Sequence, residues 1–519
     1  MRFYQSLKYM SEEKKEHFFF LFLVGLALLI FAPSFQIPFI SDEIAFIKRN
    51  AVSDLSQLPS LFAKKDYDEF YYRPLGNFVS GVVTFFAGEK APVYRFFNLM
   101  LHIANTFIFF QFAKIISRKI ENKFFAPSAA LLFLVFPAND YVLLWHTALF
   151  DRLLLGIYLL GLLSFLKNHR VTIPSIIFFI LAMLSKEAAF SFPFVIFIAD
   201  HFLNEERTSL WSSLKKSGIY FLLLVGFLLL RIILFNNNVF TAQDAHSAAN
   251  VFTIIKNYFF FGGFLLFPFS PREVQHLFLA HQTLAIIIGG IGVIAFTTLL
   301  YKKKSDKLFW FLFLFLILTI LPSSRLFMRW YLYLPSTGFI LLLCFLAFTT
   351  FKTNMGLLFT AFLLLFSLYT FFIIQKELKW LDVSKKAVIA IEELNSQNSG
   401  NTYSSIIFLT IPAKVGDIPV YQLQFETLAQ YYLKTKVKID VLSKSYFSSW
   451  DDKIHFSAKS DTAVLQHNKD NYFLLFDNKK NLNFDLKSGK QLSFPILHSE
   501  GTLFVFFSQG KFHKIIGQL

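Results

Sequence analysis

Apolar stretches separated by short polar loops recur along the first 375 residues of the chain. A helix that crosses the hydrocarbon core of a bilayer needs about 20 apolar residues. The first stretch is too long for a signal-peptide core and has no small-residue cleavage site before Ser41, so we expect it to remain as an anchor. Altogether the pattern predicts eleven membrane-spanning helices, near residues 17–39, 92–116, 124–138, 148–167, 171–185, 188–202, 216–236, 282–301, 308–322, 333–351 and 355–375.

Two of the connecting loops are too long to be simple links. The first, residues 40–91, carries an apolar stripe at steps of three or four, which is typical of a helix lying in the membrane interface. Pro59 should kink this helix. The second loop, residues 237–281, begins with a run of asparagines and ends in an aromatic segment, and it also suggests an interfacial or re-entrant structure. The stripe in the first loop consists of Ile44, Ile47, Ala51, Leu55, Leu58 and Phe62.

After about residue 376 the pattern changes to short segments typical of a soluble domain. We predict helices at 385–394 and 421–433, and strands at 404–411, 437–442, 472–476 and 502–507. The expected fold is therefore an α-helical polytopic membrane protein, with a transmembrane domain at 1–381 and a small soluble α/β domain at 382–519.

Composition supports a membrane protein. Of the 519 residues, 55% are hydrophobic and 72 are phenylalanine, and the mean hydropathy is +0.51, well outside the range of soluble domains. The net charge of +16 could suggest a nucleic-acid partner. However, the cations fall largely in short loops between apolar runs and in the C-terminal third, as membrane topology requires, so we expect no nucleic-acid binding.

The same cations give an orientation. If the N-terminus is cytoplasmic, every inner loop is basic, in agreement with the positive-inside rule. Asp42, Glu43 and Arg73 then lie on the outer face, and the odd number of spans places the C-terminal domain there as well. The inner cations are Arg2, Lys8, Lys14, Lys15, Lys114, Arg118, Lys119, Lys123, Lys167, Arg170, Arg207, Lys215, Lys216, Lys302–Lys304, Lys307 and Lys352.

Several classes of site are missing from the sequence. The single cysteine, Cys344, lies in an apolar run, so neither an intrachain disulfide nor a cysteine-rich metal site can form. There is no Walker loop and no His/Cys cluster with metal-ligand spacing. We therefore expect no metal and no nucleotide cofactor. An outward-facing enzyme of this kind would need an activated donor that arrives through the membrane.

The first candidate site is the adjacent acidic pair Asp42 and Glu43, which directly follows the first apolar span. A carboxylate at a water–membrane boundary can accept the proton of an attacking hydroxyl. Alternatively, Ser41 caps the interfacial helix and the two carboxylates complement its dipole. About thirty residues later, Arg73 precedes Pro74. Its guanidinium could hold a donor phosphate, or it could extend to lipid headgroups at a helix start.

Further polar residues interrupt or flank the apolar runs. Asn98, His102 and Asn105 share one helix face, where they could contact substrate, although interhelical hydrogen bonds are the favoured interpretation. Lys186-Glu187 separates two short runs and could form ion pairs or contact a phosphate or sugar. Other charges with the same alternatives are Asp151 and Arg152, at the start of the fourth span, and Arg325 and Arg329, before Tyr331.

The order of these motifs resembles the GT-C membrane glycosyltransferases. The matching elements are Asp42-Glu43, Tyr72-Arg73-Pro74-Leu75, Asn98 to Asn105 with His102, Leu184-Ser185-Lys186-Glu187 and Tyr331 to Ser336. The similarity spans roughly residues 17 to 350 and is closest to the protein O-mannosyltransferase branch. No single motif is decisive, but their shared order is fairly specific.

The resemblance implies an inverting transfer of a sugar, such as mannose or another hexose, from a polyprenyl- or dolichyl-phosphate carrier. The acceptor would be a hydroxyl of a protein, glycan or lipid on the outer face of a bacterial inner membrane. By the same resemblance Asp42, supported by Glu43, is the base and Arg73 contacts the donor phosphate. Weaker candidates for the phosphate or sugar are Arg152, Lys186, Arg329 and His102. The lipid-linked sugar is a co-substrate, and no cofactor is implied.

The chain differs from the O-mannosyltransferase branch in two features, and two other functions are compatible with the sequence. Animal relatives carry Glu-Arg where this chain has Arg329-Trp330, and their tetratricopeptide tail is absent here. A transporter or flippase of lipid-linked glycans would also place charges among its spans. That alternative predicts inverted repeats and broken helices, and the sequence has no internal repeat. A non-catalytic scaffold displaying the C-terminal domain is the third possibility.

Overall fold

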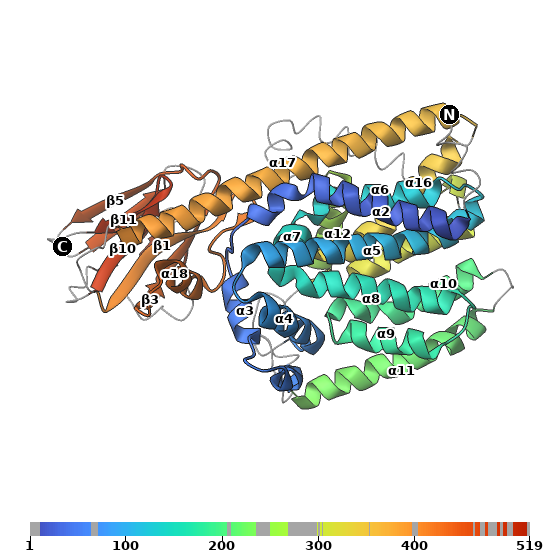
Figure 1. Ribbon diagram of the computed structural model, residues 1–519, viewed down its shortest axis with the longest axis horizontal. Helices are drawn as coiled ribbons and strands as arrows, with labels where there is room; N and C mark the ends of the chain where they lie inside the picture. The colour runs from blue at the N-terminus through green and yellow to red at the C-terminus, as the bar shows by residue number, and fades with distance from the viewer. Residues whose placement is uncertain are drawn as a thin grey trace. The chain divides into compact units, whose positions relative to one another are not determined.

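A computed structural model shows a chain that divides into two compact units (Figure 1). Unit 1 comprises residues 1–32, 52–87 and 93–377, and unit 2 comprises residues 33–51, 88–92 and 378–519. The two units are described separately below. The structure describes residues 11–63, 71–204, 209–234, 250–267, 298, 301–303, 305–351, 353–396, 403–459, 462–467, 473–475, 485–487, 491–495 and 502–515.

Unit 1 is built from helices. They are α2 (Glu12–Ile30), α4 (Pro74–Ala87), α5 (Ala91–Ile120), α6 (Phe125–Leu134), α7 (Asp140–Leu144), α8 (Leu149–Leu166), α9 (Ile173–Met183), α10 (Phe192–Leu203), α11 (Leu210–Leu234), α12 (Val251–Leu266), α15 (Lys307–Ile320), α16 (Tyr333–Thr350) and the first part of α17 (Met355–Ser396). Short 3₁₀ helices connect or extend them: η2 (Leu55–Ala63), η3 (Pro137–Asn139), η4 (His146–Ala148), η5 (Glu187–Ser191), η6 (Leu321–Ser323) and η7 (Arg329–Leu332). A further 3₁₀ helix, η1 (Ala32–Gln36), lies almost entirely in unit 2.

Helices lie at ten of the eleven predicted spans, and the remaining one, 282–301, falls outside the described residues. In the described part of the chain, five helices are long and apolar enough to cross a bilayer, or six if the bent pair α6–α7 is one span. The predicted helical, polytopic character is thus confirmed, whereas the number of crossings stays a prediction. In the second long loop, α12 occupies residues 251–266.

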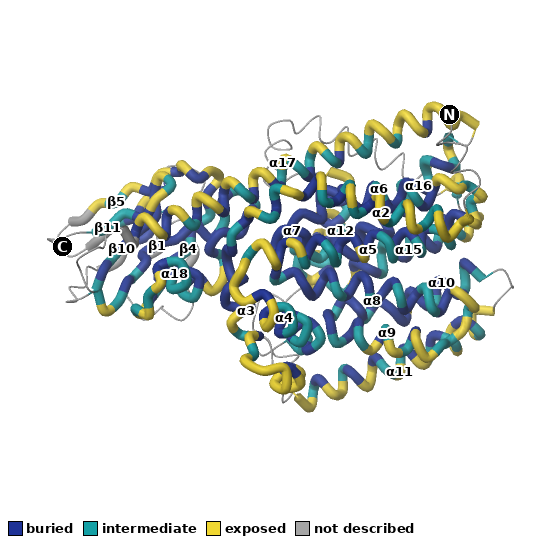
Figure 2. Tube along the Cα trace, in the orientation of Figure 1, coloured by how far each residue is buried: buried dark blue, intermediate teal, exposed yellow. Residues whose placement is uncertain are grey.

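Burial separates inner helices from outer ones. In an apolar 18-residue window of the candidate span His146–Leu166, 72% of the residues are buried, compared with 28% in the corresponding window of Leu210–Leu234. Figure 2 shows the same difference along α8 and α11. The exposed residues of α11 include Leu222, Val225 and Ile233. A helix that is apolar on both its buried and its exposed faces suits a lipid environment.

Small residues let the inner helices approach closely. A Cβ atom on Gly338 of α16 would lie 2.9 Å from the Phe315 side chain and 3.1 Å from the Leu316 backbone of α15. Glycine is therefore required where these two helices meet, as expected for membrane helix pairs whose backbones pack together. The starts of helices also have local sequence signals. At the start of α9, Thr172 and Ser175 form a capping box.

The prediction of one kinked interfacial helix in the first long loop is wrong. The segment forms two separate helices, α3 (Glu43–Asn50) and η2 (Leu55–Ala63), because the chain becomes extended at Ala51. Moreover α3 belongs to unit 2 and η2 to unit 1. The apolar stripe is divided accordingly, since Ile44 and Ile47 are buried in α3 and Phe62 is exposed in η2.

Unit 2 contains two β-sheets. β1 (Ser405–Val415) is central and runs parallel to β10 (Thr502–Ser508), β3 (Lys438–Val441) and β4 (Ser443–Phe447). β11 (Lys511–Ile515) and β7 (Phe473–Leu475) pair antiparallel at the edges, and β2 (Ile418–Pro419) pairs with β1. The second sheet has the order β5-β6-β9-β8, formed by Ile454–Lys459, Thr462–His467, Gln491–Pro495 and Asp485–Lys487. The predicted α/β character of this region is thereby confirmed in its sheet content, whereas its solubility stays a prediction.

The predicted helix at 385–394 is not a separate element. It is the end of α17, which continues without a break from Met355 to Ser396. The sequence explains this continuity, because no proline and no glycine follow Gly356 within the helix. The predicted helix at 421–433 corresponds to α18 (Phe425–Leu433).

Residues that follow the first helix are part of unit 2. The Ser41 amide donates to the Val420 carbonyl at 2.7 Å, and the Tyr432 hydroxyl donates to the Phe39 carbonyl at 2.9 Å. The candidate base Asp42 is therefore held by the unit that carries the C-terminal sheets, while Arg73 belongs to unit 1.

Candidate functional site

Unit 1 buries several ionisable side chains. Removing a charge from water is costly unless an opposite charge or several hydrogen bonds compensate for it. Such residues inside apolar helices are therefore candidates for function. The buried ones with charged side chains include Arg95, Asp140, Asp151, Arg152, Lys186, Arg231 and Arg329.

Two arginines converge on one carboxylate. Arg73 donates to Glu187 Oε2 from Nε at 3.1 Å and from Nη2 at 2.7 Å. Arg231, near the end of α11, lies 3.7 Å from the other oxygen, Oε1. Burial raises the pKa of Glu187, but Arg73 and Arg231 outweigh that effect and lower it overall. The Leu75 amide, which donates to the Leu184 carbonyl at 3.2 Å, holds the start of α4 against the end of α9.

The neighbouring Lys186 pairs with a different helix. Its Nζ lies 2.6 and 2.5 Å from the two carboxylate oxygens of Asp151, near the start of α8. The same ammonium group sits 4.4 Å above the centre of the Tyr331 ring. Burial lowers the pKa of Lys186 to about 8, against the opposing effect of Asp151. The adjacent residues 186 and 187 thus link two ion pairs at the break between α9 and α10.

A third ion pair lies close by in the chain. Arg329, two residues before Tyr331, donates to Asp140 Oδ1 at 2.8 Å. Lys376 lies 3.8 Å from the same oxygen, and the Arg329 guanidinium stacks 4.9 Å from the Tyr141 ring. The three pairs therefore join side chains from different helical elements of unit 1.

Arg152 stabilises the backbone around the α7–α8 break. Its guanidinium donates to the Val142 carbonyl, to the Trp145 carbonyl at 3.2 Å and to the His146 carbonyl at 3.0 Å. Arg95 does the same for the Leu144 carbonyl at 2.8 Å. These contacts show Arg152 in a positioning role, holding carbonyl groups that the helix break leaves without intrahelical partners.

The polar face of α5 makes interhelical hydrogen bonds. His102 Nε2 lies 3.0 Å from the Leu134 carbonyl, so this nitrogen carries the proton, and Nδ1 accepts from the Tyr333 hydroxyl at 2.7 Å. Asn105 donates to the Arg152 carbonyl at 2.8 Å. His102 and Asn105 therefore make interhelical hydrogen bonds, which was the favoured interpretation of this polar face.

In unit 2 the acidic pair has two different environments. Ser41 takes a left-handed conformation (φ +54°), and its hydroxyl accepts from the Leu423 amide at 3.3 Å. The alternative that Ser41 caps the helix is therefore wrong, because Asp42 occupies the N-cap position. The Asp42 carboxylate makes no capping hydrogen bond, whereas Glu43 accepts from the Ile40 amide at 3.0 Å. A left-handed non-glycine residue directly before Asp42 is the kind of backbone strain found at functional sites.

Several of these residues were missed by sequence reasoning. Asp140, Arg231 and Lys376 complete the ion pairs but stand alone in the sequence. The signal that could have found them is a single charge within or beside an apolar run. Among the described residues, no group of three His, Cys, Asp or Glu side chains could hold a metal ion.

Comparisons with known families and with curated proteins find no match for this chain. The geometry of unit 1 is therefore the main guide to its chemistry. Closely spaced guanidinium and ammonium groups in a low-dielectric setting are suited to binding a phosphate group.

Proposed function

We propose that the protein is an inverting glycosyltransferase that moves a hexose from a polyprenyl-phosphate carrier to an acceptor hydroxyl. The acceptor belongs to a protein, glycan or lipid on the outer face of a bacterial inner membrane, and the N-terminus is cytoplasmic. The observation that carries this proposal is the convergence of Arg73 and Arg231 on Glu187 beside Lys186. The order of motifs along residues 17 to 350 supplies the reaction class.

The chemistry of the leaving group explains why cations are useful. The donor is a phosphodiester with one negative charge. As the bond between the anomeric carbon and the phosphate oxygen breaks, the carrier phosphate gains a second charge. A cluster of cations stabilises that dianion more than the intact donor, and this difference accelerates the reaction. In this proposal Arg73 and Lys186 contact the phosphate, and Arg329 supports the cluster from the Asp140 side.

The acceptor hydroxyl must lose its proton as its oxygen bonds to the anomeric carbon. We assign this proton to Asp42 on the strength of the family resemblance. Glu43 is already hydrogen-bonded to the Ile40 amide, so it acts as a positioning residue for the turn. The leaving phosphate needs no proton from a second acid, because it is already a good leaving group.

Transfer assays with the full-length protein and a polyprenyl-phosphate hexose test the phosphate site. We expect Arg73→Gln to lower turnover about 10²–10³-fold, the usual loss when one charge-stabilising group is removed. Because Glu187 keeps Arg231 at 3.7 Å, this variant should retain its fold. Arg170→Gln removes the same charge from an exposed loop residue and is the matched control. Equal turnover in both variants would remove Arg73 from the site.

A separate assay tests the base. Asp42→Asn should lower transfer about 10²–10⁴-fold without weakening donor binding, because the amide cannot accept the proton. Glu43→Gln should have a smaller effect and should lower thermal stability as well, since it alters a buried hydrogen bond. If Asp42→Asn transfers sugar at the unchanged rate, Asp42 is not the base.

One observation favours the transporter alternative. The helices Phe125–Leu134 and Pro137–Leu144 meet at a bend of 42°, as in a broken or re-entrant span, and broken helices often line translocation routes. Reconstitution into vesicles with a lipid-linked sugar separates the two functions. A transferase releases the carrier phosphate and forms a new glycoside, whereas a flippase moves the intact donor across the bilayer.

A further inference from the structure

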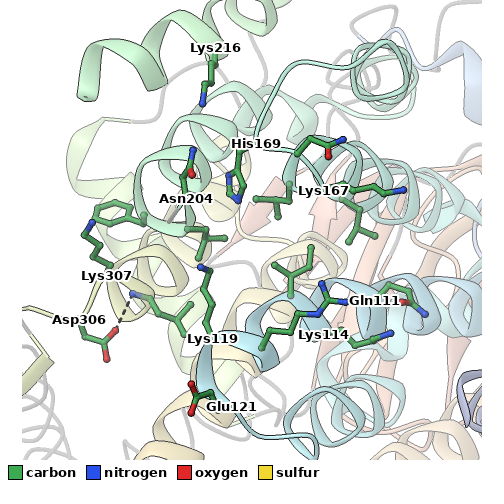
Figure 3. Close-up of a pocket in the computed structure, with 18 residues that line it drawn as sticks. Gln111, Lys114, Lys119, Glu121, Lys167, His169, Asn204, Lys216, Asp306 and Lys307 are labelled. Carbon is green, nitrogen blue, oxygen red and sulfur yellow. Dashed lines mark hydrogen bonds between the residues drawn. The ribbon is translucent and has the colours of Figure 1, made fainter. Parts of the chain in front are cut away.

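A cavity of about 1270 Å³ opens at the end of unit 1 that is far from the ion pairs. The ends of α5, α8 and α10 and the first parts of α11 and α15 line it (Figure 3). Asp151 and Leu166 lie at opposite ends of α8, fifteen residues apart, which corresponds to about 22 Å along a helix. Lys216 at the cavity and Arg231 at the ion pairs are separated by the same number of residues on α11. The cavity is therefore a separate site.

Positive charge dominates the cavity wall. Six lysine or arginine side chains line it, compared with two carboxylates, Glu121 and Asp306. Asp306 is already used, because it caps α15 by accepting from the Leu308 and Phe309 amides at 3.0 and 3.1 Å. The six cations, most of which are visible in Figure 3, are Lys114, Arg118, Lys119, Lys167, Lys216 and Lys307.

The cations differ in their partners. Lys114 pairs with Glu16 on α2, and Lys216 lies 2.8 Å from Asp200 on α10. For the side chains of Arg118, Lys167 and Lys307, the described part of the chain provides no hydrogen-bond or ion-pair partner. Even when the neighbouring Glu16 and Asp200 are counted with the two lining carboxylates, the cations exceed the anions by two.

Helix dipoles explain only some of these positions. Arg118 is in the last turn of α5 and Lys167 directly follows α8, where cations are favourable. Lys307, however, is the first residue of α15, where the positive end of the dipole opposes a cation. A negatively charged ligand would offset that repulsion, and several side chains of the wall would contribute to holding it.

The remaining wall identifies the ligand as an amphiphile. Besides the cations, part of the lining is apolar and consists of Ile115, Leu163, Leu166, Leu203 and Leu308. A soluble anion gains nothing from such a surface, whereas a lipid can place its phosphate among the cations and its glycerol and acyl carbons against the leucines. Basic pockets between membrane helices on the cytoplasmic side commonly bind anionic lipid headgroups.

We propose that this cavity binds the phosphate headgroup of an anionic phospholipid, with Arg118, Lys167 and Lys307 as its main contacts. The proposal goes beyond sugar transfer and does not depend on it. Bound lipid would bridge the ends of the five helices that line the cavity, and so would stabilise unit 1 from the cytoplasmic leaflet.

The test uses the full-length protein in neutral detergent, with cardiolipin as the added anionic lipid. Binding is measured by native mass spectrometry and by the rise in unfolding temperature. The triple variant Arg118→Gln/Lys167→Gln/Lys307→Gln should bind cardiolipin on the order of a hundredfold more weakly, from about fivefold per cation. The control Lys123→Gln/Lys215→Gln/Lys302→Gln removes equal charge from exposed residues that do not line the cavity, and its affinity should change less than about twofold.

Each remaining outcome counts against the proposal. Equal loss in the two triple variants would show a general surface-charge effect and no site. Protection by inorganic phosphate as strong as that by cardiolipin would show a soluble-anion site. Phosphatidylcholine serves as the neutral lipid, and equal binding of it would also exclude the proposal. Because lipid binding is the readout, failure of the sugar-transfer assay leaves these results unaffected.

Discussion

The two units bury their carboxylates in different ways. In unit 1, Asp140, Asp151 and Glu187 face arginine and lysine side chains from other parts of the sequence. Asp140 and Arg329, for example, are 189 residues apart. In unit 2, the buried Glu43 and Asp452 accept hydrogen bonds from groups three or four residues away. The ion pairs of unit 2 that join described residues are largely exposed ones, such as Lys386–Asp382.

This difference has a physical meaning. A carboxylate held by its own turn stabilises local structure and can form as soon as that turn forms. A buried ion pair between distant segments gains little net stability, because desolvation offsets most of the attraction. Its retention therefore points to specificity or function. By this criterion the charges of the proposed donor-phosphate site lie in unit 1, whereas in unit 2 the buried Glu43 and Asp452 shape loops.

The largest expected effect comes from breaking a buried pair in unit 1. Asp151→Asn keeps the shape of the side chain but leaves Lys186 buried without its carboxylate. We expect a loss of about 3–5 kcal/mol in the free energy of unfolding, measured by denaturant titration in detergent. The double variant Asp151→Leu/Lys186→Met should recover most of that stability and yet transfer no sugar.

That pair of variants separates structure from function. If the double variant is as unstable as the single one, the ion pair is needed for folding itself. If the double variant is stable and active, Lys186 has no role in binding the donor. Either result would weaken the conclusion that the buried ion pairs of unit 1, unlike the buried carboxylates of unit 2, are retained for function.

The next largest expected effect is a loss of stability of unit 2 as the pH falls. His467 is 5% exposed, packed against Phe447 and Phe473 at ring distances of 5.5 and 4.3 Å. Burial lowers its pKa from 6.5 to about 4, although Asp452 acts in the opposite direction. The unfolded chain therefore takes up a proton as the pH falls below about 6.5, while the folded unit does not until about pH 4. Stability should fall across that window, by roughly 3 kcal/mol at most.

Hydrogen exchange of the amides in β4 and β7, followed by mass spectrometry in the full chain, measures this loss. His467→Phe should flatten the dependence between pH 6.5 and pH 4, and the exposed His455→Gln should leave it unchanged. An unaltered pH profile in His467→Phe would assign the effect to another group.

A smaller effect is expected for the buried carboxylate that shapes a loop of unit 2. Asp452 accepts from the Ser448 amide and hydroxyl, both at 2.8 Å, and from the Ser449 amide at 3.1 Å. Replacing it in Asp452→Ala should reduce stability by about 1–3 kcal/mol. The neighbouring Asp451 is exposed, so Asp451→Ala is the control and should change little. Sugar transfer should survive in both variants once stability is allowed for.

Much of the fold could be predicted from the sequence, because its signals are local. Apolar length placed the helices of unit 1, and alternating patterns placed β1, β3 and β10. The break at Ala51, which divides the first long loop between the units, carries no such signal. The unbroken α17 was divided in error where its composition changes, although no helix-breaking residue stands there.

The candidate site could be predicted from the sequence only in part, because its ion pairs are not local. Arg73, Lys186 and Arg329 stand out in the sequence because charges are rare near apolar runs. Their partners could not be assigned, because pairing across 35, 114 or 189 residues depends on how separate helices pack. Lys186 and Glu187 do form ion pairs, which was one of the two alternatives, and each pairs with a residue from another element.

The smallest expected effect tests whether burial alone makes the difference between the units. Lys386 lies 2.8 Å from Asp382, one helical turn earlier in α17, and both side chains are about half exposed. A double-mutant cycle with Lys386→Ala and Asp382→Ala should give a coupling of about 0.3–0.5 kcal/mol, reduced further by salt. The same cycle on Asp151 and Lys186 should give a coupling several times larger. A coupling above about 1 kcal/mol for the exposed pair would mean that unit 2 also relies on ion pairs, and the functional interpretation of the buried pairs would lose its basis.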